Sequence, residues 1–335
     1  MPSLDRGSNP IVIAGASSLL GAELRSLLEE SRFAGVEFRL VDEEMAAGIL
    51  TEAGGEPAVI RPVEEGTFDH AAKVFFTGSA EFTLRNLTAA RDAKARVIDL
   101  SGTAAAEEST VSWFPKLDVL QGRTFPTDAR VYAIPSAAGT VTASLALGLA
   151  KIGVSRLAVI HFQPVSEAGR AGIEELESQT GQLLSFQGMG QPVFDTQVAF
   201  NLLARFGPGS QHKLSVVRER LRVETKACLG KKSVMPALQL IHAPVFYGTA
   251  FSACAELAPG TKVEQVVAAC EDAGFVIPAD EGAGPSNVSV AGEKVAHLAK
   301  PEEDPARPGA WWFWGAADNI RMPAANAVKL AEMLP

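Results

Sequence analysis

The run Gly15-Ala16-Ser17-Ser18-Leu19-Leu20-Gly21 separates an apolar stretch, 10–14, from a segment with helical spacing of apolar residues, 19–31. The order strand, glycine turn, helix is typical of the phosphate-binding turn that opens a dinucleotide-binding domain. Gly15 permits the tight turn, Gly21 lets the helix approach the sheet, and N–H groups at the helix start can hold a phosphate. This stretch predicts the fold of the first half of the chain.

Alternation of strands and helices continues after this turn and predicts a doubly wound parallel sheet. The expected strands are 36–41, 58–61, 73–76, 96–99 and 131–134, and a crossover helix is expected at 80–91. The fold class is therefore α/β, with a Rossmann-type NAD(P)-binding domain.

The pattern changes after residue 137, where a second, α+β domain with a mixed or antiparallel sheet is expected. Its predicted helices are 137–151, 171–186 and 212–229, and its predicted first strand is 155–163. Further antiparallel strands are expected at 238–241, 245–256, 287–290 and 312–317. With 335 residues, 47% of them apolar, the chain is long enough for two cores.

Composition excludes several classes of protein. The net charge of −9 repels nucleic acid and anionic membranes, and no run of eighteen apolar residues is present. Residues 1–9 lack the charged and apolar regions of a signal peptide, so a cytoplasmic location is expected. Three scattered cysteines and five histidines without partner spacing predict no metal site.

A second informative stretch is Ala133-Ile134-Pro135-Ser136-Ala137-Ala138-Gly139-Thr140. It predicts a strand, 130–134, followed by a long apolar helix with Ser136 as its N-cap. Such a helix start lowers the pKa of a thiol and offers N–H donors to an oxyanion, which is why nucleophilic cysteines favour it. Here that position is Ala137, which has no reactive group.

Five motifs in the same order resemble those of the aspartate-semialdehyde dehydrogenase family, and the resemblance covers almost the whole chain. They are Gly15–Gly21, Val74-Phe-Phe-Thr-Gly78, Val97-Ile-Asp-Leu-Ser101, 162–172 and Trp314-Gly-Ala-Ala-Asp-Asn-Ile-Arg321. Within the family, Ala243-Pro-Val-Phe-Tyr-Gly248 is most similar to the Usg-like, catalytically degenerate group, which carries no settled biochemical role.

The resemblance implies two domains and a homodimer. Residues 1–134, joined by a returning C-terminal helix, 321–335, are expected to form the dinucleotide-binding domain. Residues 135–320 are expected to form the dimerisation and substrate domain.

The family reduces β-aspartyl phosphate with NADPH through a cysteine thioester, and the match places Ala137 on that cysteine. It places Thr249 on the catalytic histidine, and a threonine cannot accept a proton as imidazole does. The phosphate-binding arginine falls on Ala105. A hydroxyl nucleophile, Ser136 or Thr140, would need an adjacent base.

Three substrate-binding positions keep polar residues. Gln163 matches the glutamine that positions the acyl group, and Arg220 stands in place of a phosphate-contacting lysine. His242 occupies the position of the arginine that pairs with the substrate carboxylate.

The end of the second strand indicates the choice of cofactor. The family has a serine and an arginine there for the 2′-phosphate of NADP, whereas this chain has Asp42 and Glu44. Carboxylates repel that phosphate and can instead bind ribose hydroxyls, so NAD is favoured over NADP and neither is expected to bind tightly. The expected cofactor contacts are Gly15, Ser17, Ser18, Leu19, Gly21, Asp42, Thr77 and Asn319.

These features predict a dimeric, dehydrogenase-derived protein without the thioester chemistry, which binds a nucleotide or a small acidic metabolite and acts as a sensor or as the partner of another protein. Two alternatives remain open. One is an NAD(P)-dependent oxidoreductase that transfers hydride directly to a different small, semialdehyde-like or acidic substrate. The other is a purely structural dimer.

Overall fold

The computed structural model describes residues 9–279, 282 and 284–335, and the chain divides into two compact units. The first unit comprises the residues up to Phe114, Thr124–Pro135 and Pro323–Pro335; the second comprises Pro115–Arg123 and Ser136–Met322. Residues 115–123, which the sequence placed in the first domain, group with the second unit. Residues 1–8, on which the absence of a signal peptide was argued, lie outside the described residues.

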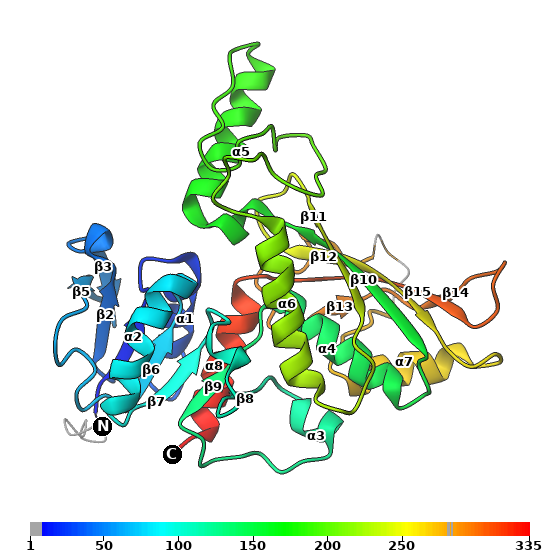
Figure 1. The fold of residues 1–335 in the computed structure, drawn as a ribbon, viewed down its shortest axis with the longest axis horizontal. Helices are drawn as coiled ribbons and strands as arrows, with labels where there is room; N and C mark the ends of the chain where they lie inside the picture. Colours follow the sequence, from blue (N-terminus) through cyan, green and yellow to red (C-terminus); the bar gives the residue numbers. More distant parts are fainter. Residues whose placement is uncertain (1–8, 280–281, 283) are drawn as a thin grey trace. The chain divides into compact units, whose positions relative to one another are not determined.

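The first unit contains a seven-stranded parallel sheet in the order β5-β2-β1-β6-β7-β9-β8 (Figure 1). This order confirms the predicted α/β class. The strands are β1 (Ile11–Ala14), β2 (Phe38–Asp42), β5 (Arg61–Pro62), β6 (Lys73–Phe76), β7 (Arg96–Asp99), β8 (Val111–Ser112) and β9 (Val131–Ala133).

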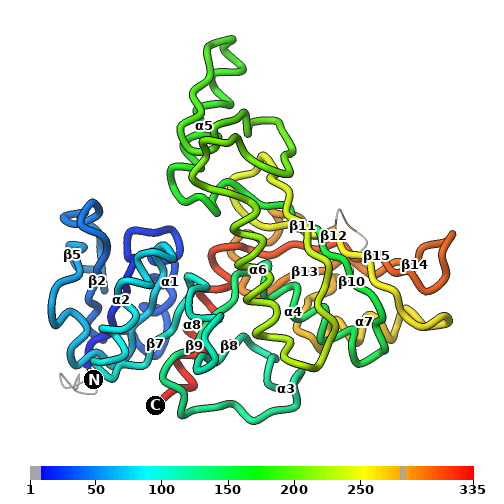
Figure 2. The backbone as a smooth tube through the Cα atoms, viewed as in Figure 1, coloured from blue at the N-terminus to red at the C-terminus, as the bar shows by residue number. Residues whose placement is uncertain are grey.

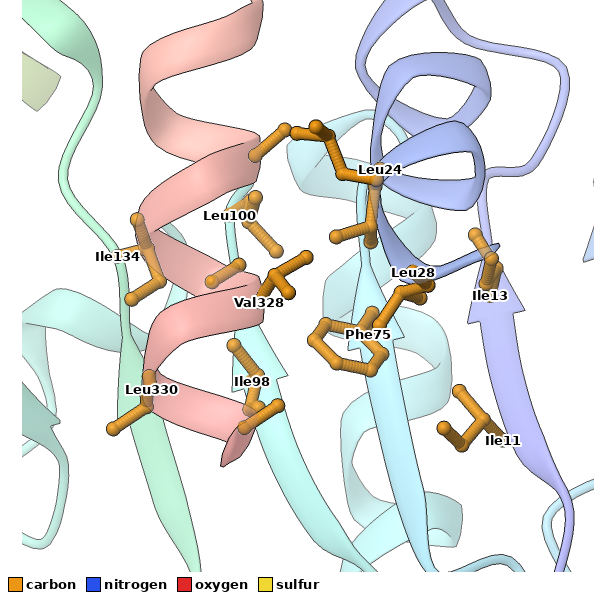
Figure 3. Close-up of a cluster of buried hydrophobic side chains, with 14 of the residues drawn as sticks. Ile11, Ile13, Leu24, Leu28, Phe75, Ile98, Leu100, Ile134, Val328 and Leu330 are labelled. Carbon is orange, nitrogen blue, oxygen red and sulfur yellow. The ribbon is translucent and has the colours of Figure 1, made fainter. Parts of the chain in front are cut away.

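Helices cover both faces of this sheet, as a buried parallel sheet requires. On one face, α1 (Leu19–Glu29) and α8 (Arg321–Met333) share a core with Ile11, Ile13, Phe75 and Ile98. Figure 3 shows Leu24 and Leu28 of α1 and Val328 and Leu330 of α8 over the strands. On the other face, α2 (Ala80–Asp92) packs Phe82 and Leu87 against Val12, Val74 and Phe76.

The strand expected at 58–61 is divided between two sheets. Its first two residues belong to β4 (Glu56–Val59), which forms a separate antiparallel hairpin with β3 (Leu50–Ala53), with Gly54 and Gly55 at the turn. Only β5 joins the parallel sheet, beside β2. Two short 3-10 helices, η1 (Glu44–Ala46) and η2 (Ala104–Ala106), complete this unit.

The second unit contains a six-stranded mixed sheet in the order β11-β10-β12-β15-β13, with β14 also paired to β15. The strands are β10 (Arg156–Gln163), β11 (Ala237–His242), β12 (Thr249–Glu256), β13 (His297–Leu298), β14 (Glu302–Glu303) and β15 (Ala310–Ala317). The antiparallel direction expected for the strand at 238–241 was wrong, because β11 runs parallel to β10. The segment between the two strands contains helices, and it returns the chain to the edge of β10 in the same direction.

Two other strand predictions also need correction. The strand expected at 245–256 begins only at Thr249, because Pro244 and Gly248, with its φ of +79°, interrupt the extended backbone. Residues 287–290 form turns rather than a strand; Ser289 bonds back to Ser286, which is typical of serine-rich turns.

The helices of the second unit are α3 (Leu117–Gln121), α4 (Ala137–Ala150), α5 (Gly169–Leu184), α6 (Leu214–Leu229) and α7 (Val263–Asp272), with the 3-10 helix η3 (Val165–Ala168) before α5. Almost every residue of α4 is buried, and the helix contacts α6 and α7. After α5 the chain folds back along that helix, and Figure 2 shows both the helix and the returning segment in green. Glu175 and Gln179 hold the returning segment through the backbone of Val193 and Val198.

No helix in the described part of the chain is long and apolar enough to cross a membrane.

Candidate functional site

The glycine turn of the first unit is a close crossing of two backbones. Gly15 has a φ of +95°, and a Cβ placed on it would lie 2.1 Å from the backbone nitrogen of Gly78. A Cβ on Gly21 would lie 2.5 Å from the Gly15 carbonyl oxygen. Both glycines are therefore required by packing, in addition to any contact with a cofactor.

Ser18, which replaces the middle glycine of the family motif, is the N-cap of α1. Its hydroxyl oxygen accepts from the N–H of Gly21 at 2.9 Å, and its proton is donated to the Thr77 carbonyl at 3.0 Å. The Thr77 hydroxyl is donated in turn to the Gly15 carbonyl at 3.0 Å. These predicted cofactor residues thus tie the turn after β1 to the turn after β6.

Two more predicted cofactor residues, Ser17 and Asp42, contact each other. The N–H and the hydroxyl of Ser17 both donate to Asp42 Oδ2, at 2.8 and 2.6 Å. The N–H of Glu43 donates to Asp42 Oδ1 at 2.8 Å, and Asp42 is buried. The carboxylate already accepts three hydrogen bonds, so it has little remaining capacity for a ribose hydroxyl.

The first turn of α1 retains donors suited to a phosphate. Among the described residues, the N–H groups of Leu19 and Leu20 have no protein acceptor, as expected for a helix start. At the tip of β2, Asp42 is a buried carboxylate and Glu44 an exposed one. The cation nearby, Arg85, is paired with Glu43 at 3.1 Å.

In the second unit, the start of α4 is held by a carboxylate of α6. The hydroxyl of Ser136 donates to Glu224 Oε2 at 2.6 Å, and its oxygen accepts from the N–H of Gly139. Glu224 is buried and its other oxygen accepts from Nε of Arg220 at 2.7 Å. This contact aligns the half-exposed Arg220 with the helix start.

The two positions at which the sequence analysis expected the family's catalytic pair are buried. Ala137 is 2% exposed, and Thr249 is 2% exposed with its hydroxyl donated to the Phe162 carbonyl at 3.3 Å. Thr140 is also buried, and the Ser136 hydroxyl serves as an N-cap. Ala105, at which the sequence analysis expected the family's phosphate-binding arginine, lies in η2 of the first unit.

Gln163 and His242 are brought together at the ends of two neighbouring strands, where they are partners in the parallel register. Gln163 is buried and its Oε1 has no hydrogen-bond donor, which marks an acceptor available to a ligand. His242 Nε2 lies 3.2 Å from the Val198 carbonyl, and its ring contacts Phe194 and Phe206. Burial lowers the pKa of His242, so the imidazole is a weak substitute for an arginine.

Asn319, a predicted cofactor residue, belongs to the second unit and joins three of its segments. Its Oδ1 accepts from the N–H of Gly248 at 2.8 Å, while its Nδ2 donates to Ser166 and to Glu167 Oε1, each at 3.1 Å. Burial raises the pKa of Glu167, and the charge of Arg220 opposes that shift. The side chain of Asn319 therefore has a structural role within this unit.

One imidazole contacts α4. His161 Nε2 lies 2.8 Å from the Thr142 hydroxyl, on the second turn of the helix, and burial lowers the His161 pKa to about 3. A ring with such a pKa is a poor general base at neutral pH. The three cysteines are poorly suited to act as nucleophiles: Cys228 is buried on α6, and burial raises the pKa of Cys254 on β12 and that of Cys270 on α7, the latter to about 12.

Sequence reasoning missed Glu224 and Glu167. The spacing of Arg220 and Glu224, four apart on a helix, is a signal for their ion pair. Nothing in the sequence indicates that Glu224 reaches Ser136. Among the described residues, no group of three His, Cys, Asp or Glu side chains could hold a metal ion.

Comparison with known proteins identifies the family. Residues 146–322 match the model described as semialdehyde dehydrogenase, dimerisation domain. A USG-1 protein homolog of Pseudomonas aeruginosa is 30% identical, with 97% of each chain covered, and aspartate-semialdehyde dehydrogenase 2 of Vibrio cholerae is 26% identical, also with 97% of each covered.

Solved structures show the same fold. The structure of a probable aspartate-semialdehyde dehydrogenase from Pseudomonas aeruginosa has a TM-score of 0.83 at 27% identity, with 97% of each chain covered. A Candida albicans aspartate-semialdehyde dehydrogenase with NADP has a TM-score of 0.65 at 16% identity, with 97% of this chain and 98% of that chain covered. Taken with the glycine turn and the site around α4, these matches show that the chain belongs to the aspartate-semialdehyde dehydrogenase family.

Proposed function

We propose that this protein is a homodimer that has lost the family's thioester chemistry and binds a small acidic metabolite or nucleotide at the ancestral substrate site. The observation that carries the proposal is the environment of Ala137. It occupies the buried first turn of α4, where a thiol would be activated, and it supplies no nucleophile. The hydroxyls of Ser136 and Thr249 are engaged in hydrogen bonds within the protein.

The groups that remain around α4 and β10 favour binding of an anion. The N–H groups of Ala137 and Ala138 have no protein acceptor among the described hydrogen bonds, and Arg220 provides a positive charge held by Glu224. The buried Oε1 of Gln163 is an additional acceptor for a ligand N–H or O–H. A small molecule with a carboxylate or phosphate and one donor group matches this set.

The proposal is tested by assaying the purified protein in both directions with aspartate semialdehyde or β-aspartyl phosphate, at high protein concentration. We expect no substrate-dependent oxidation of NADPH or reduction of NADP. The matched variant is Ala137→Cys, for which intact-protein mass spectrometry should detect an acyl adduct with β-aspartyl phosphate that the wild type does not form. Turnover by the wild-type protein would refute the proposal.

The homodimer is proposed to form through the outer face of the second sheet. Strand pairing places Ile160, Ser252 and Trp314 in one row across this face, and Ala158, Cys254 and Trp312 in the next. Trp312 and Trp314 are 47% and 42% exposed. Two neighbouring indole rings exposed to water form an apolar patch that would gain free energy from burial against a partner. This face lies within residues 146–322, the segment that matches a dimerisation domain, so a second copy is the occupant we propose.

Light scattering after size exclusion checks this assembly. We expect a dimer for the wild type and a shift to monomer for Trp314→Glu, because a charge would be buried in the interface. Phe186→Glu, at the exposed end of α5 and away from this face, is the control and should stay dimeric. A monomeric wild type, or a dimeric Trp314→Glu, contradicts the assignment.

A second candidate function is direct hydride transfer to a different small substrate. It is favoured by the unpaired N–H groups of Leu19 and Leu20, which could hold the pyrophosphate of a dinucleotide; when bound, such a cofactor would supply the hydride. Asp42 then favours NAD over NADP. Fluorescence titration with NADH and NADPH separates the candidates, since the oxidoreductase requires one of them to bind.

A further inference from the structure

A basic cavity lies in the second unit, apart from the residues that surround Ala137. Its volume is about 380 Å³, and its wall includes Arg205, Lys213 and Arg218. The remaining wall is formed by the 204–208 loop, the start of α6 and Leu240 of β11. One lining residue, Phe206, also contacts His242, and the three cations make none of the contacts described above for the candidate substrate site.

The three cations are not neutralised by neighbouring carboxylates. In the described part of the chain, none of them forms an ion pair, whereas the adjacent α6 residues Arg220 and Arg222 are paired with Glu224 and Glu219. The whole protein carries a net charge of −9, so acidic partners are abundant elsewhere. Three unpaired cations around one cavity repel one another, and a bound anion would relieve that repulsion.

Arg218 is the best-positioned of the three. Its Nη1 donates to Gln239 Oε1 at 2.9 Å, which fixes the guanidinium against β11, while its Nε is buried without an acceptor. A buried donor without a partner is costly, and a fixed guanidinium has directional donors for an oxyanion. The guanidinium is therefore held in place with hydrogen-bonding capacity left over.

The first turn of α6 contributes further donors. Lys213 is the N-cap and makes no side-chain capping bond, and the N–H groups of Leu214 and Ser215, both on the cavity wall, have no acceptor among the described hydrogen bonds. The nearby carboxylate of Asp195 is occupied in holding the loop, since it accepts from the N–H of Gly209 at 2.7 Å.

Arg218 of the cavity and Arg220 of the candidate substrate site lie on different sides of α6. Arg218 and Arg220 are two residues apart, so they project about 200° apart around the helix axis. Arg218 bonds to β11, and Arg220 bonds to Glu224 beside α4. A ligand in the cavity would thus contact the side of α6 that carries Arg218, which is opposite to the side that carries Arg220.

We propose that this cavity is a second binding site, for a small multivalent anion carrying phosphoryl or carboxylate groups. The guanidinium groups of Arg205 and Arg218 bind its oxygens in pairs, Lys213 adds a point charge, and the start of α6 adds N–H donors. The site does not depend on the function proposed for the region around Ala137.

Isothermal titration calorimetry of the full-length protein with pyrophosphate, and separately with citrate, tests the proposal. We expect saturable binding of at least one of them, which also distinguishes a phosphoryl ligand from a carboxylate ligand. Arg218→Gln should weaken binding by about tenfold to a hundredfold, the range for loss of a charged hydrogen-bond donor. Arg222→Gln, on an exposed part of α6, should change the affinity less than twofold.

Two further variants keep the test decisive. Arg205→Gln removes a charge from an exposed loop residue and is expected to fold normally, so it should weaken binding by about tenfold even if Arg218→Gln is unstable. Arg220→Gln should leave this binding within twofold while it impairs any binding near Ala137. Failure of the wild type to bind either anion, or equal binding by Arg205→Gln and wild type, would overturn the proposal.

Discussion

The carboxylate of Glu224 accepts hydrogen bonds from both the N–H and the hydroxyl of Ser136, at 3.1 and 2.6 Å, across 88 residues of sequence. A buried carboxylate is costly unless it is paired, and here the ion pair with Arg220 and the start of α4 provide the partners. The positive end of the α4 dipole lies beside the same carboxylate. One charged side chain therefore holds both the first turn of α4 and the guanidinium of Arg220.

This arrangement predicts a strong coupling between Ser136 and Glu224. Ser136→Ala should lower the free energy of unfolding by about 2 kcal/mol, because it removes both the cap and a bond to a charged group. Ser79→Ala, which removes the N-cap of α2, should cost about 1 kcal/mol. Urea unfolding of the single variants and of Ser136→Ala/Glu224→Ala gives the coupling energy. A coupling near zero would contradict the structural role of this pair.

A second prediction concerns the glycine turn. Gly15→Ala should destabilise the protein by several kcal/mol, because it combines a φ of +95° with a Cβ only 2.1 Å from backbone. Gly54→Ala is the matched control: its φ is +63° and a Cβ would have no neighbour within 4 Å, so only about 1 kcal/mol of backbone strain is expected. Thermal and urea unfolding compare the two. Equal losses would mean that the crossing with Gly78 contributes little.

The buried His161 predicts a loss of stability in acid. Its pKa is about 3 in the folded protein against 6.5 for the free side chain, so the unfolded state binds the proton first. Stability is therefore lost as the pH falls from about 6.5 to about 3, by as much as about 5 kcal/mol at the lower end. His212 and His242, whose pKa values burial also lowers, contribute in the same direction.

Measurement of the unfolding free energy between pH 7 and pH 4 checks this prediction. His161→Gln should make the unfolding free energy depend less steeply on pH, whatever the substitution does to stability at pH 7. His70→Gln, at an exposed position, should leave the slope as in the wild type. An unchanged slope in His161→Gln would show that the ring is not held neutral.

The choice of cofactor can be tested at Asp42. In the wild type we expect weak binding of NADH and at least tenfold weaker binding of NADPH, because the buried carboxylate repels a 2′-phosphate. Asp42→Asn should reduce that ratio by about tenfold, whereas Glu44→Gln, at an exposed residue, should change it less than twofold. Fluorescence titration measures both cofactors. A wild-type preference for NADPH would contradict the interpretation of Asp42.

The sequence predicted the parallel sheet well, since strands such as β1 and β6 are short apolar runs that a buried sheet requires. It predicted the second sheet less well. The direction of β11 depends on where the segment after α5 returns the chain, and 287–290 contains apolar residues at the spacing of a strand although its serines form turns. Neither outcome follows from local periodicity.

The candidate site was predicted in part. Gln163 and His242, both expected to bind substrate, lie side by side because β11 runs parallel to β10, a direction that the sequence analysis did not predict. Ser17, Ser18 and Thr77 contact protein groups rather than leaving their hydroxyls free for a ligand. The partners in two of these hydrogen bonds are separated by 25 and 59 positions in the sequence. The bonds therefore depend on tertiary structure that a motif does not encode.

The return of α8 to the first unit has a consequence for biosynthesis. The strands of that unit are translated before the second unit, but the helix that covers one face of their sheet, with Val328 and Leu330, is translated after it. Until then Ile98 and Phe75 lack part of their cover, so the nascent chain exposes an apolar surface throughout synthesis of the entire second unit. Synthesis of α8, rather than completion of the sheet, is therefore the step at which the core of the first unit gains its full cover.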